Sequence, residues 1–227
     1  MWDGRVETLE SQPINPITNP VEMASKMEDV IEKLNHSAIY RKLFYNVYTD
    51  SQITQKMLLN ALFQFDVMLV STNSKYDSIQ RNEQGVQFTN EELRGYEIYK
   101  KNCAACHPEP LFTNQGFENN GLPFDTALKD YGRAAITGKS SDSFYFKVPS
   151  LRNVAVSAPY MHDGRFSKLK DVIEHYNTGT IHSNKVSAKL NKNMQLTPQD
   201  KKDLVAFLNT LTDKAFLYDV KFRAEVQ

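Results

Sequence analysis

The sequence of 227 residues has two cysteines, one tryptophan, no net charge and no long apolar run. Two cysteines exclude a scaffold built on many disulfides. No stretch of the sequence reaches the ~18 consecutive apolar residues that indicate a membrane-spanning helix, so no membrane span is expected. The 27 Lys and Arg residues balance the 27 Asp and Glu residues, which argues against a bulk nucleic-acid binder. The first residues also lack the basic and apolar regions of a signal peptide.

Hydrophobic residues make up 41% of the chain and charged residues 24%, which is ordinary for a globular protein. At about 150 residues per domain, the length allows one domain or two. Helical spacing of apolar residues recurs along the chain, whereas no convincing set of strands is found. The predicted fold is therefore mainly α-helical, with long loops.

Three prolines lie within the first 20 residues, which predicts an irregular but ordered loop over residues 1–20. Apolar residues at helical spacing then predict a helix that begins near Val21 and passes Leu34. A short helix is expected over residues 40–48, and a longer one from the N-cap Thr54 to Val70. The buried stripe of this longer helix is expected to consist of Met57, Leu58, Ala61, Leu62, Phe65, Met68 and Leu69.

Residues 71–87 are polar and read as a connection between two regions. Thr89, followed three positions later by Glu92, is a capping box that predicts a helix running towards Cys103. Residues 108–149 are rich in Gly, Asn, Pro and aromatic residues, which favours loops with short helical turns. Further helices are expected over residues 168–176 and from Thr197, with Pro198 at the first helical position.

The most specific motif is Cys103-Ala104-Ala105-Cys106-His107. C-x-x-C-H is the attachment sequence for c-type haem. Thiols at this spacing can form thioethers with the two vinyl groups of one porphyrin, and the adjacent histidine then ligates the iron. The rival interpretations are a thioredoxin-like redox pair and half of a zinc site. They are disfavoured because the sequence holds no second C-x-x-C and no βαβ pattern around the motif.

A second ligand for the iron cannot be chosen from spacing alone. Methionines are more often core filler than ligands, and lone histidines are more often hydrogen-bonded structural groups. The downstream candidates are Met161, His162, His175, Tyr176, His182 and Met194.

Several segments in this order resemble the bacterial dihaem cytochrome c peroxidase and MauG family. The resemblance covers nearly the whole chain, which makes it far more specific than the haem motif alone. It rests on residues 2–5, positions 9–23, and residues 103–107, 148–154, 158–164 and 204–208.

This resemblance implies a cytochrome c-like helical haem domain over residues 86–227. Residues 1–85 would be the remnant of an N-terminal, peroxidatic haem domain with its linking helices. The family's proteins carry two haem motifs, and the motif at 103–107 matches the second. We therefore expect the chain to be a piece of a longer protein with two haems, of which one belongs here.

The resemblance also implies roles for single residues near the peroxide pocket. Glu22 aligns with the acidic residue that moves a proton during O–O cleavage, which is general acid–base work; by itself Glu22 would read as an ordinary carboxylate near a helix N-terminus. Gln12 aligns with a neighbour of that pocket. Trp2 aligns with the indole that relays electrons between the two haems, although a lone tryptophan otherwise indicates packing.

Two metal sites follow from the same resemblance. Cys103, Cys106 and His107 hold the haem, and Tyr176 falls where the peroxidases have methionine and MauG has tyrosine. Met194, which precedes the last helix, is the alternative ligand, whereas His162 is expected to line the haem site. Ser157 and Pro159 align with residues whose backbone carbonyls bind calcium, and such oxygens suit a hard cation.

The implied function is electron transfer in the reduction of hydrogen peroxide to water, by a cytochrome c peroxidase-type oxidoreductase in the periplasm. The chain by itself is expected to be a weak or inactive peroxidase. The expected partners are hydrogen peroxide, a small electron-donor cytochrome or cupredoxin, and a second copy in a homodimer. Two alternatives stay open: a monohaem c-type electron-transfer cytochrome, and MauG-like oxidation of a protein substrate.

Overall fold

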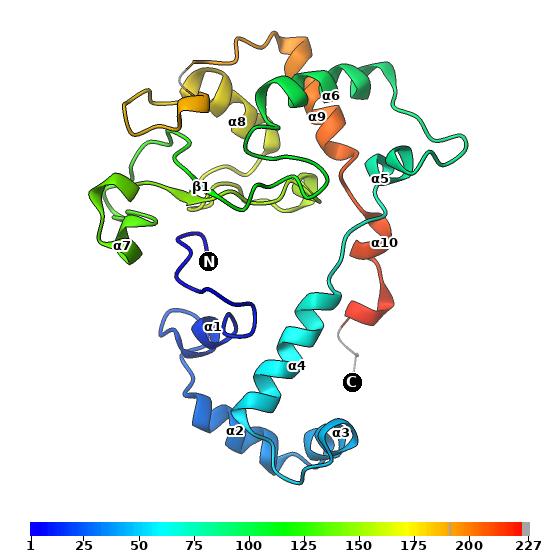
Figure 1. Cartoon of the computed structure of the whole chain (residues 1–227), viewed down its shortest axis with the longest axis vertical. Coiled ribbons are helices and arrows are strands. Elements are labelled where there is room, and N and C mark those ends of the chain that lie inside the picture. Colours follow the sequence, from blue (N-terminus) through cyan, green and yellow to red (C-terminus); the bar gives the residue numbers. More distant parts are fainter. Residues whose placement is uncertain (191, 224–227) are drawn as a thin grey trace. The chain divides into compact units, whose positions relative to one another are not determined.

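The computed structural model describes residues 1–190 and 192–223. In this part of the chain, Met1 and Arg5–Val70 form one compact unit, and Trp2–Gly4 form another with the residues from Ser71 onward. The mainly helical fold with long loops that the sequence predicts is confirmed (Figure 1). Among the described residues, no helix combines the length and the apolar character needed to cross a membrane.

The first unit is built of helices joined by turns and short irregular segments. Thr54 Oγ1 accepts a hydrogen bond from the Met57 backbone N–H at 3.3 Å, so the fourth helix begins directly after Thr54, as predicted. Ser37 caps the third helix in the same way through the Tyr40 N–H. The helices are α1 (Ile14–Thr18), α2 (Met27–His36), α3 (Ala38–Tyr48) and α4 (Gln55–Met68).

The N-terminal segment differs from the prediction in two places. Helix α1 lies inside the segment that was expected to be an irregular loop. Pro16 falls in its first turn, where backbone N–H groups have no acceptor within the helix, so a proline is tolerated there. The helix expected from Val21 begins only at Met27. Asn19 closes a turn before it, because its side chain accepts from the Val21 N–H and donates to Glu22.

The predicted buried stripe of α4 is wrong. Every residue of α4 is half-buried or exposed, and the apolar residues at its C-terminal end are the most exposed. Phe65 is 44% exposed and Met68 57%. Helix α4 packs against α2, but the partner does not cover the whole stripe, so helical spacing alone overstated its burial.

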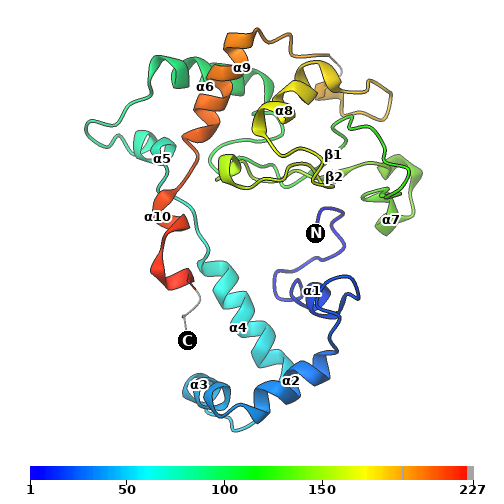
Figure 2. The same ribbon diagram turned by 180° about the vertical axis from the view of Figure 1, so that it is seen from behind.

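In its described part, the second unit contains two helices of more than ten residues, several shorter ones, a small β-ladder and extended loops. Strands β1 and β2 lie side by side (Figure 2) and pair antiparallel. Phe117 lies opposite Lys147 in this pairing. This ladder was missed from the sequence because each strand has only two residues. The helices and strands are α5 (Lys75–Gln80), α6 (Asn90–Asn102), β1 (Phe117–Glu118), α7 (Ala134–Thr137), β2 (Phe146–Lys147), α8 (Leu169–Glu174), α9 (Pro198–Asn209) and α10 (Lys214–Leu217).

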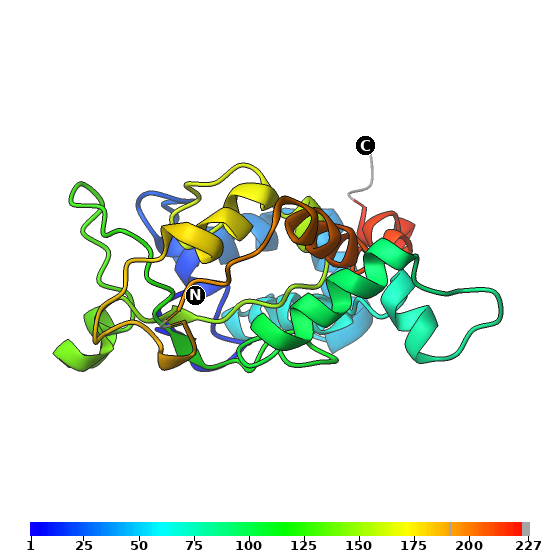
Figure 3. The same cartoon turned by 90° about the horizontal axis from the view of Figure 1, so that it is seen from above.

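Helices α6 and α9 lie against each other and form the centre of this unit (Figure 3). Both begin where the sequence predicts, after Thr89 and Thr197. Each start is a capping box, which the sequence predicts for Thr89. Gly95 in α6 allows close approach, because a Cβ there would lie 2.0 Å from the backbone oxygen of Asp203 in α9. The crossing therefore depends on a residue without a side chain.

The described core around this crossing combines aromatic and aliphatic side chains in equal number. Each fully buried apolar side chain stabilises the fold by about 1.5–3 kcal/mol. Phe207 lies near the centre, with its ring centroid 5.0 Å from that of Tyr99 and 5.1 Å from that of Tyr96. The buried cluster consists of Tyr76, Tyr99, Phe112, Ile173, Leu204, Phe207, Leu208 and Leu211.

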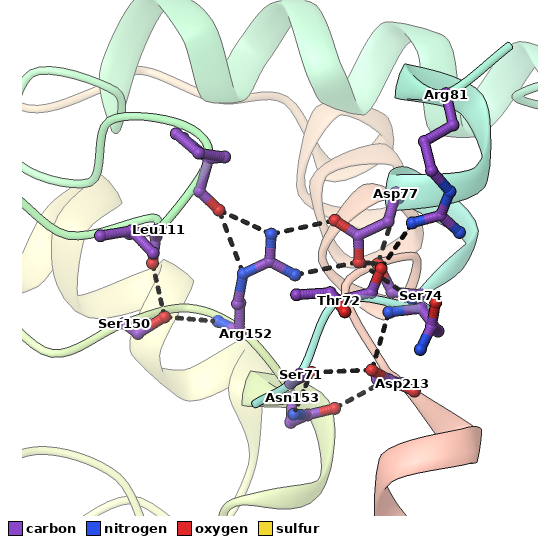
Figure 4. Close-up of polar contacts among 12 residues, drawn as sticks. Ser71, Thr72, Ser74, Asp77, Arg81, Leu111, Ser150, Arg152, Asn153 and Asp213 are labelled. Atoms are coloured by element: carbon purple, nitrogen blue, oxygen red, sulfur yellow. Dashed lines mark hydrogen bonds and ion pairs between the residues drawn. The ribbon is translucent and has the colours of Figure 1, made fainter. Parts of the chain in front are cut away.

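A polar network connects α5 to the loops that follow the haem motif (Figure 4). The Arg152 guanidinium donates to both carboxylate oxygens of Asp77 at 2.9 Å, and also to the Pro110 carbonyl at 2.7 and 3.0 Å. Asp77 is part of the capping box of α5 with Ser74. The segment that reads as a polar connection in the sequence is therefore anchored to the second unit.

The same network extends to α10 through Asp213 (Figure 4). Its carboxylate accepts from the Asn73 N–H at 2.8 Å and from the Ser71 hydroxyl at 3.2 Å. Asn153 donates to Ser71 and accepts from the Asp213 N–H, which closes the ring of contacts. Three segments that are far apart in sequence, at residues 71–73, 153 and 213, are thus joined by hydrogen bonds.

Candidate functional site

A cavity of about 450 Å³ lies inside the second unit and is lined by all three chemical groups of the haem motif. This volume is in the range of sites that bury a cofactor, about 300–1,000 Å³. Most of the remaining lining is apolar. The apolar lining includes Phe146, Val148, Leu151, Val154, Leu169, Val172, Ile173, Leu204 and Leu208.

The motif follows directly on the C-terminal end of α6. The Cys103 N–H bonds to the Tyr99 carbonyl at 2.8 Å, and the His107 N–H bonds to the Cys103 carbonyl at 2.9 Å. This turn brings Cys103, Cys106 and His107 to the cavity. The Tyr99 hydroxyl also donates to the His107 carbonyl, which fixes the backbone at the histidine.

The ring of His107 is held in one orientation. Its Nδ1 lies 3.0 Å from the carbonyl oxygens of both Phe112 and Pro149. Carbonyl oxygens only accept hydrogen bonds, so this network assigns the hydrogen to Nδ1 and leaves the Nε2 lone pair available for a metal. Burial lowers the pKa of His107, which favours the neutral, ligating form. Such hydrogen bonding of the far ring nitrogen is typical of metal-ligating histidines.

The two cysteines are free thiols. Burial raises the pKa of Cys103 to about 12 and also raises the pKa of Cys106. Burial thus favours the protonated thiols, unlike the low-pKa thiolate of a reactive redox pair. In the described ranges, no three His, Cys, Asp or Glu side chains are placed together to hold a metal ion.

The candidates for the second ligand separate into two groups. Met161, His162, Tyr176 and Met194 line the cavity. His175 instead bonds through Nε2 to the Asn120 carbonyl at 3.0 Å, and His182 bonds to Asn193 at 2.9 Å on the surface. The structure therefore brings Tyr176 and its alternative Met194 to the cavity together.

Tyr176 lies in a π-helical turn, His175–Gly179, that continues α8. Such turns occur often at functional sites. The Asn120 amide nitrogen lies 3.4 Å from the Tyr176 hydroxyl oxygen. Burial raises the pKa of Tyr176, and the bond from Asn120 opposes this shift. The phenol is thus a neutral group of a residue that lines the cavity.

His162 also belongs to the cavity lining. Its ring stacks on Phe146, with 3.7 Å between the ring centroids and an interplanar angle of 11°. Burial lowers the pKa of His162, although Asp163 and Asp130 oppose the shift. His162 is therefore a neutral, packed wall residue.

Trp2 lines the same cavity and is 42% exposed. Its backbone carbonyl accepts from the Lys147 N–H at 2.7 Å, which attaches the N-terminal segment to β2. Ser157 and Pro159 line the cavity as well, and the Ser157 hydroxyl donates to the Val154 carbonyl at 3.3 Å. The calcium role of their carbonyl oxygens stays a prediction.

Gln12 and Glu22 belong to the first unit. Glu22 is exposed, and its carboxylate accepts from the Asn19 amide at 2.8 Å. Gln12 is half-buried, and its backbone N–H bonds to the Leu9 carbonyl. Their catalytic roles stay predictions.

Polar groups of the cavity that the sequence analysis did not single out include Asn120 and Glu118. Glu118 accepts from Lys189 at 3.1 Å and from the Ser187 hydroxyl. Asn119-Asn120-Gly121 reads in the sequence only as a turn signal. Their place in the cavity depends on contacts between distant segments, which a single sequence does not reveal.

The residues present fit haem c. Both thiols and a neutral histidine with a free Nε2 share one apolar cavity with further donor atoms of Tyr176 and Met194. The fold and this site together define a c-type cytochrome. Residues 93–212 match the family model "Cytochrome c", and residues 1–85 match the model "Di-haem cytochrome c peroxidase".

The chain is similar to curated relatives along almost its whole length. It is 35% identical over 218 residues to the methylamine utilization protein MauG of Methylophilus methylotrophus, covering 93% of this chain and 63% of that protein. It is 31% identical over 214 residues to the cytochrome c551 peroxidase of Nitrosomonas europaea, covering 93% of this chain and 60% of that protein. The chain thus spans somewhat less than two thirds of the length of these relatives.

The chain is also similar to a solved structure. The crystal structure of a MauG-like protein associated with microbial copper homeostasis superimposes with a TM-score of 0.85 at 30% identity, covering 98% of this chain and 75% of that chain. The chain belongs to the dihaem cytochrome c peroxidase and MauG family. The expected cytochrome c-like fold is thereby confirmed.

Proposed function

We propose that the second unit is a haem c electron-transfer domain. The observation that carries the proposal is the cavity lined by Cys103, Cys106 and His107, whose Nδ1 is bonded to backbone carbonyls. Haem c, when bound there, supplies a carrier of single electrons. The thiols would anchor it covalently, His107 would ligate the iron, and Tyr176 would be the second ligand, with Met194 as the alternative.

We further propose that this electron transfer serves the reduction of hydrogen peroxide to water. The proposal draws on family membership and on relatives named cytochrome c peroxidase. Electrons would come from a small cytochrome or cupredoxin and leave this unit past Trp2, whose indole lines the cavity. The Glu22 carboxylate would move the proton between the peroxide oxygens, with Gln12 beside it.

The proposal assumes a periplasmic protein, because haem c is attached outside the bacterial cytoplasm. It also assigns calcium to the carbonyl oxygens of Ser157 and Pro159, since neutral oxygens suit this cation.

A second candidate function is peroxide-dependent oxidation of a protein. The observation in its favour is the tyrosine at the cavity, because oxygen ligation stabilises oxidised iron more than methionine does. A low potential would make the unit a poor acceptor for electrons from small cytochromes. A relative named MauG is as similar to the chain as the peroxidases are.

The first experiment measures the haem content of the chain produced in the periplasm of a host with the c-type maturation machinery. The pyridine haemochrome is expected to show one covalent haem per chain, and reduced small cytochromes are expected to exchange electrons with it. A chain that contains no covalent haem would overturn the proposal.

The second experiment measures peroxide turnover by the product of the complete gene. Glu22→Gln is expected to lower turnover by about 10²-fold or more, the range of general acid–base catalysis. The matched control is Glu28→Gln, at an exposed position of α2 in the same unit, and is expected to keep turnover. Equal turnover in both variants would contradict the role of Glu22. The chain of 227 residues itself is expected to show little turnover.

A further inference from the structure

Asn120 holds the turn that carries Tyr176 from several directions. Its side-chain oxygen accepts from the Leu122 N–H at 3.3 Å. This bond orients the amide, so the NH₂ group faces the Tyr176 hydroxyl oxygen at 3.4 Å and the Met161 sulfur at 3.5 Å. An amide NH₂ has two hydrogens, so it can donate to both partners at once.

The backbone of the same residue contacts the neighbour of Tyr176. The Asn120 carbonyl accepts from His175 Nε2 at 3.0 Å, which assigns the hydrogen on that ring to Nε2. Successive residues of the π-helical turn, His175 and Tyr176, are therefore bonded to one asparagine.

Gly121, the next residue, contacts the chain just after the other end of the π-helical turn. Gly121 has a φ of +66° and its carbonyl accepts from the Ile181 N–H at 2.9 Å. A Cβ at Gly121 would lie 2.5 Å from Cγ2 of Thr180, so a larger residue does not fit. The segment 119–121 and the turn thus form one packed pair, and the position of the Asn120 amide is fixed by more than its own bonds.

We propose that Asn120 is a positioning residue that sets how strongly the Tyr176 oxygen donates to the haem iron. This inference rests on the proposed role of Tyr176 as the second ligand. A hydrogen bond donated to a ligand oxygen withdraws electron density from it, so the oxygen stabilises oxidised iron less. Hydrogen bonds around the ligand are among the means by which a protein tunes a haem potential.

The test compares midpoint potentials and optical spectra of the haem-loaded chain. Asn120→Leu keeps the approximate shape of the side chain but removes the donor. It is expected to shift the midpoint potential to a more negative value. The matched control is Asn209→Leu, at an exposed position near the end of α9, and is expected to keep the parent potential. An unchanged potential in Asn120→Leu would overturn the inference.

A second variant protects the test against misfolding. Asn120→Asp keeps the size of the residue and an oxygen that accepts from Leu122. It places an oxygen where the NH₂ group faced Tyr176. The potential is again expected to become more negative, and haem content and melting temperature report whether each variant is folded.

Tyr176→Phe separates this inference from the proposed ligand role. If Tyr176 is the ligand, Tyr176→Phe changes both spectrum and potential, and Asn120→Leu adds no further shift in that background. If Tyr176→Phe leaves both unchanged, the ligand assignment fails and the inference falls with it. If Tyr176→Phe changes them but Asn120→Leu has the same effect with and without Tyr176, Asn120 acts independently of the ligand and only the inference is overturned.

Discussion

Arg152 and Asp77 form a bidentate ion pair in which both N–O distances are 2.9 Å. The two side chains are only 13% and 10% exposed. Arg152 reaches the cavity, and its guanidinium also bonds to the Pro110 carbonyl beyond the haem motif. The pair therefore joins the segment before α6 to the loops around the cofactor site.

Breaking this pair is expected to destabilise the second unit. Asp77→Ala leaves the charge of Arg152 without its partner in a buried place, which costs about 3–5 kcal/mol. Urea unfolding measures the loss. The control is Glu83→Ala, which removes the exposed pair with Arg81 and is expected to leave the midpoint nearly unchanged, since exposed pairs contribute little. Equal effects of the two variants would contradict the structural role of Asp77.

The same pair predicts a dependence on pH. Burial raises the pKa of Asp77, but hydrogen bonds from Arg152 and Ser74 outweigh burial, so the pKa is lowered on folding. A lowered pKa contributes stability above the unfolded value of about 3.9, and this contribution is lost as the pH falls through the folded value. Urea midpoints between neutral pH and pH ~3 are expected to fall less steeply in Asp77→Asn than in the parent. Parallel curves would contradict the assignment.

Removal of both thiols is expected to abolish covalent haem. The double variant Cys103→Ala and Cys106→Ala lacks both thioether anchors, although His107 keeps its orientation through Phe112 and Pro149. Mass spectrometry of the denatured chain measures bound haem. The melting temperature is also expected to fall, because a group that binds only the folded state stabilises it. Haem that stays attached to the variant after denaturation would disprove attachment at these thiols.

The crossing of α6 and α9 is expected to be sensitive to a single methyl group. In Gly95→Ala the new Cβ would lie 2.0 Å from the Asp203 oxygen, so the helices must separate. Overpacking of this kind costs about 1–3 kcal/mol. The control is Gly116→Ala, where the nearest atom is the flexible Asn114 side chain at 3.2 Å. Thermal unfolding is expected to show a clear loss of stability for Gly95→Ala and a smaller one for the control.

The features that sequence predicted well are local. The caps at Thr54, Thr89 and Thr197 bond to residues three positions away, so their pattern is visible in the chain. The motif at 103–107 is local in the same sense. The long stripe of α4 failed because its burial depends on what packs against it, and helical spacing carries no information about that.

In the candidate site, too, the local motif is visible in the sequence, whereas contacts between distant residues are not. Tyr176 was one of six candidates by spacing, and resemblance to the family favoured it. Its contact with Asn120 joins residues 56 positions apart. Likewise, the carbonyl of Pro149 reaches His107 over 42 positions. Only the folded chain shows which loops supply these bonds.

The segment between β1 and β2 includes an exposed stretch that is suited to an insertion. Residues 123–130 are exposed, while the loop is fixed at both ends by the pairing of β1 with β2. A short reporter peptide inserted near Thr126 would therefore lengthen a surface loop without altering the spacing of the haem-binding groups. We expect such an insertion to be tolerated, because exposed loop tips accept insertions better than other sites do.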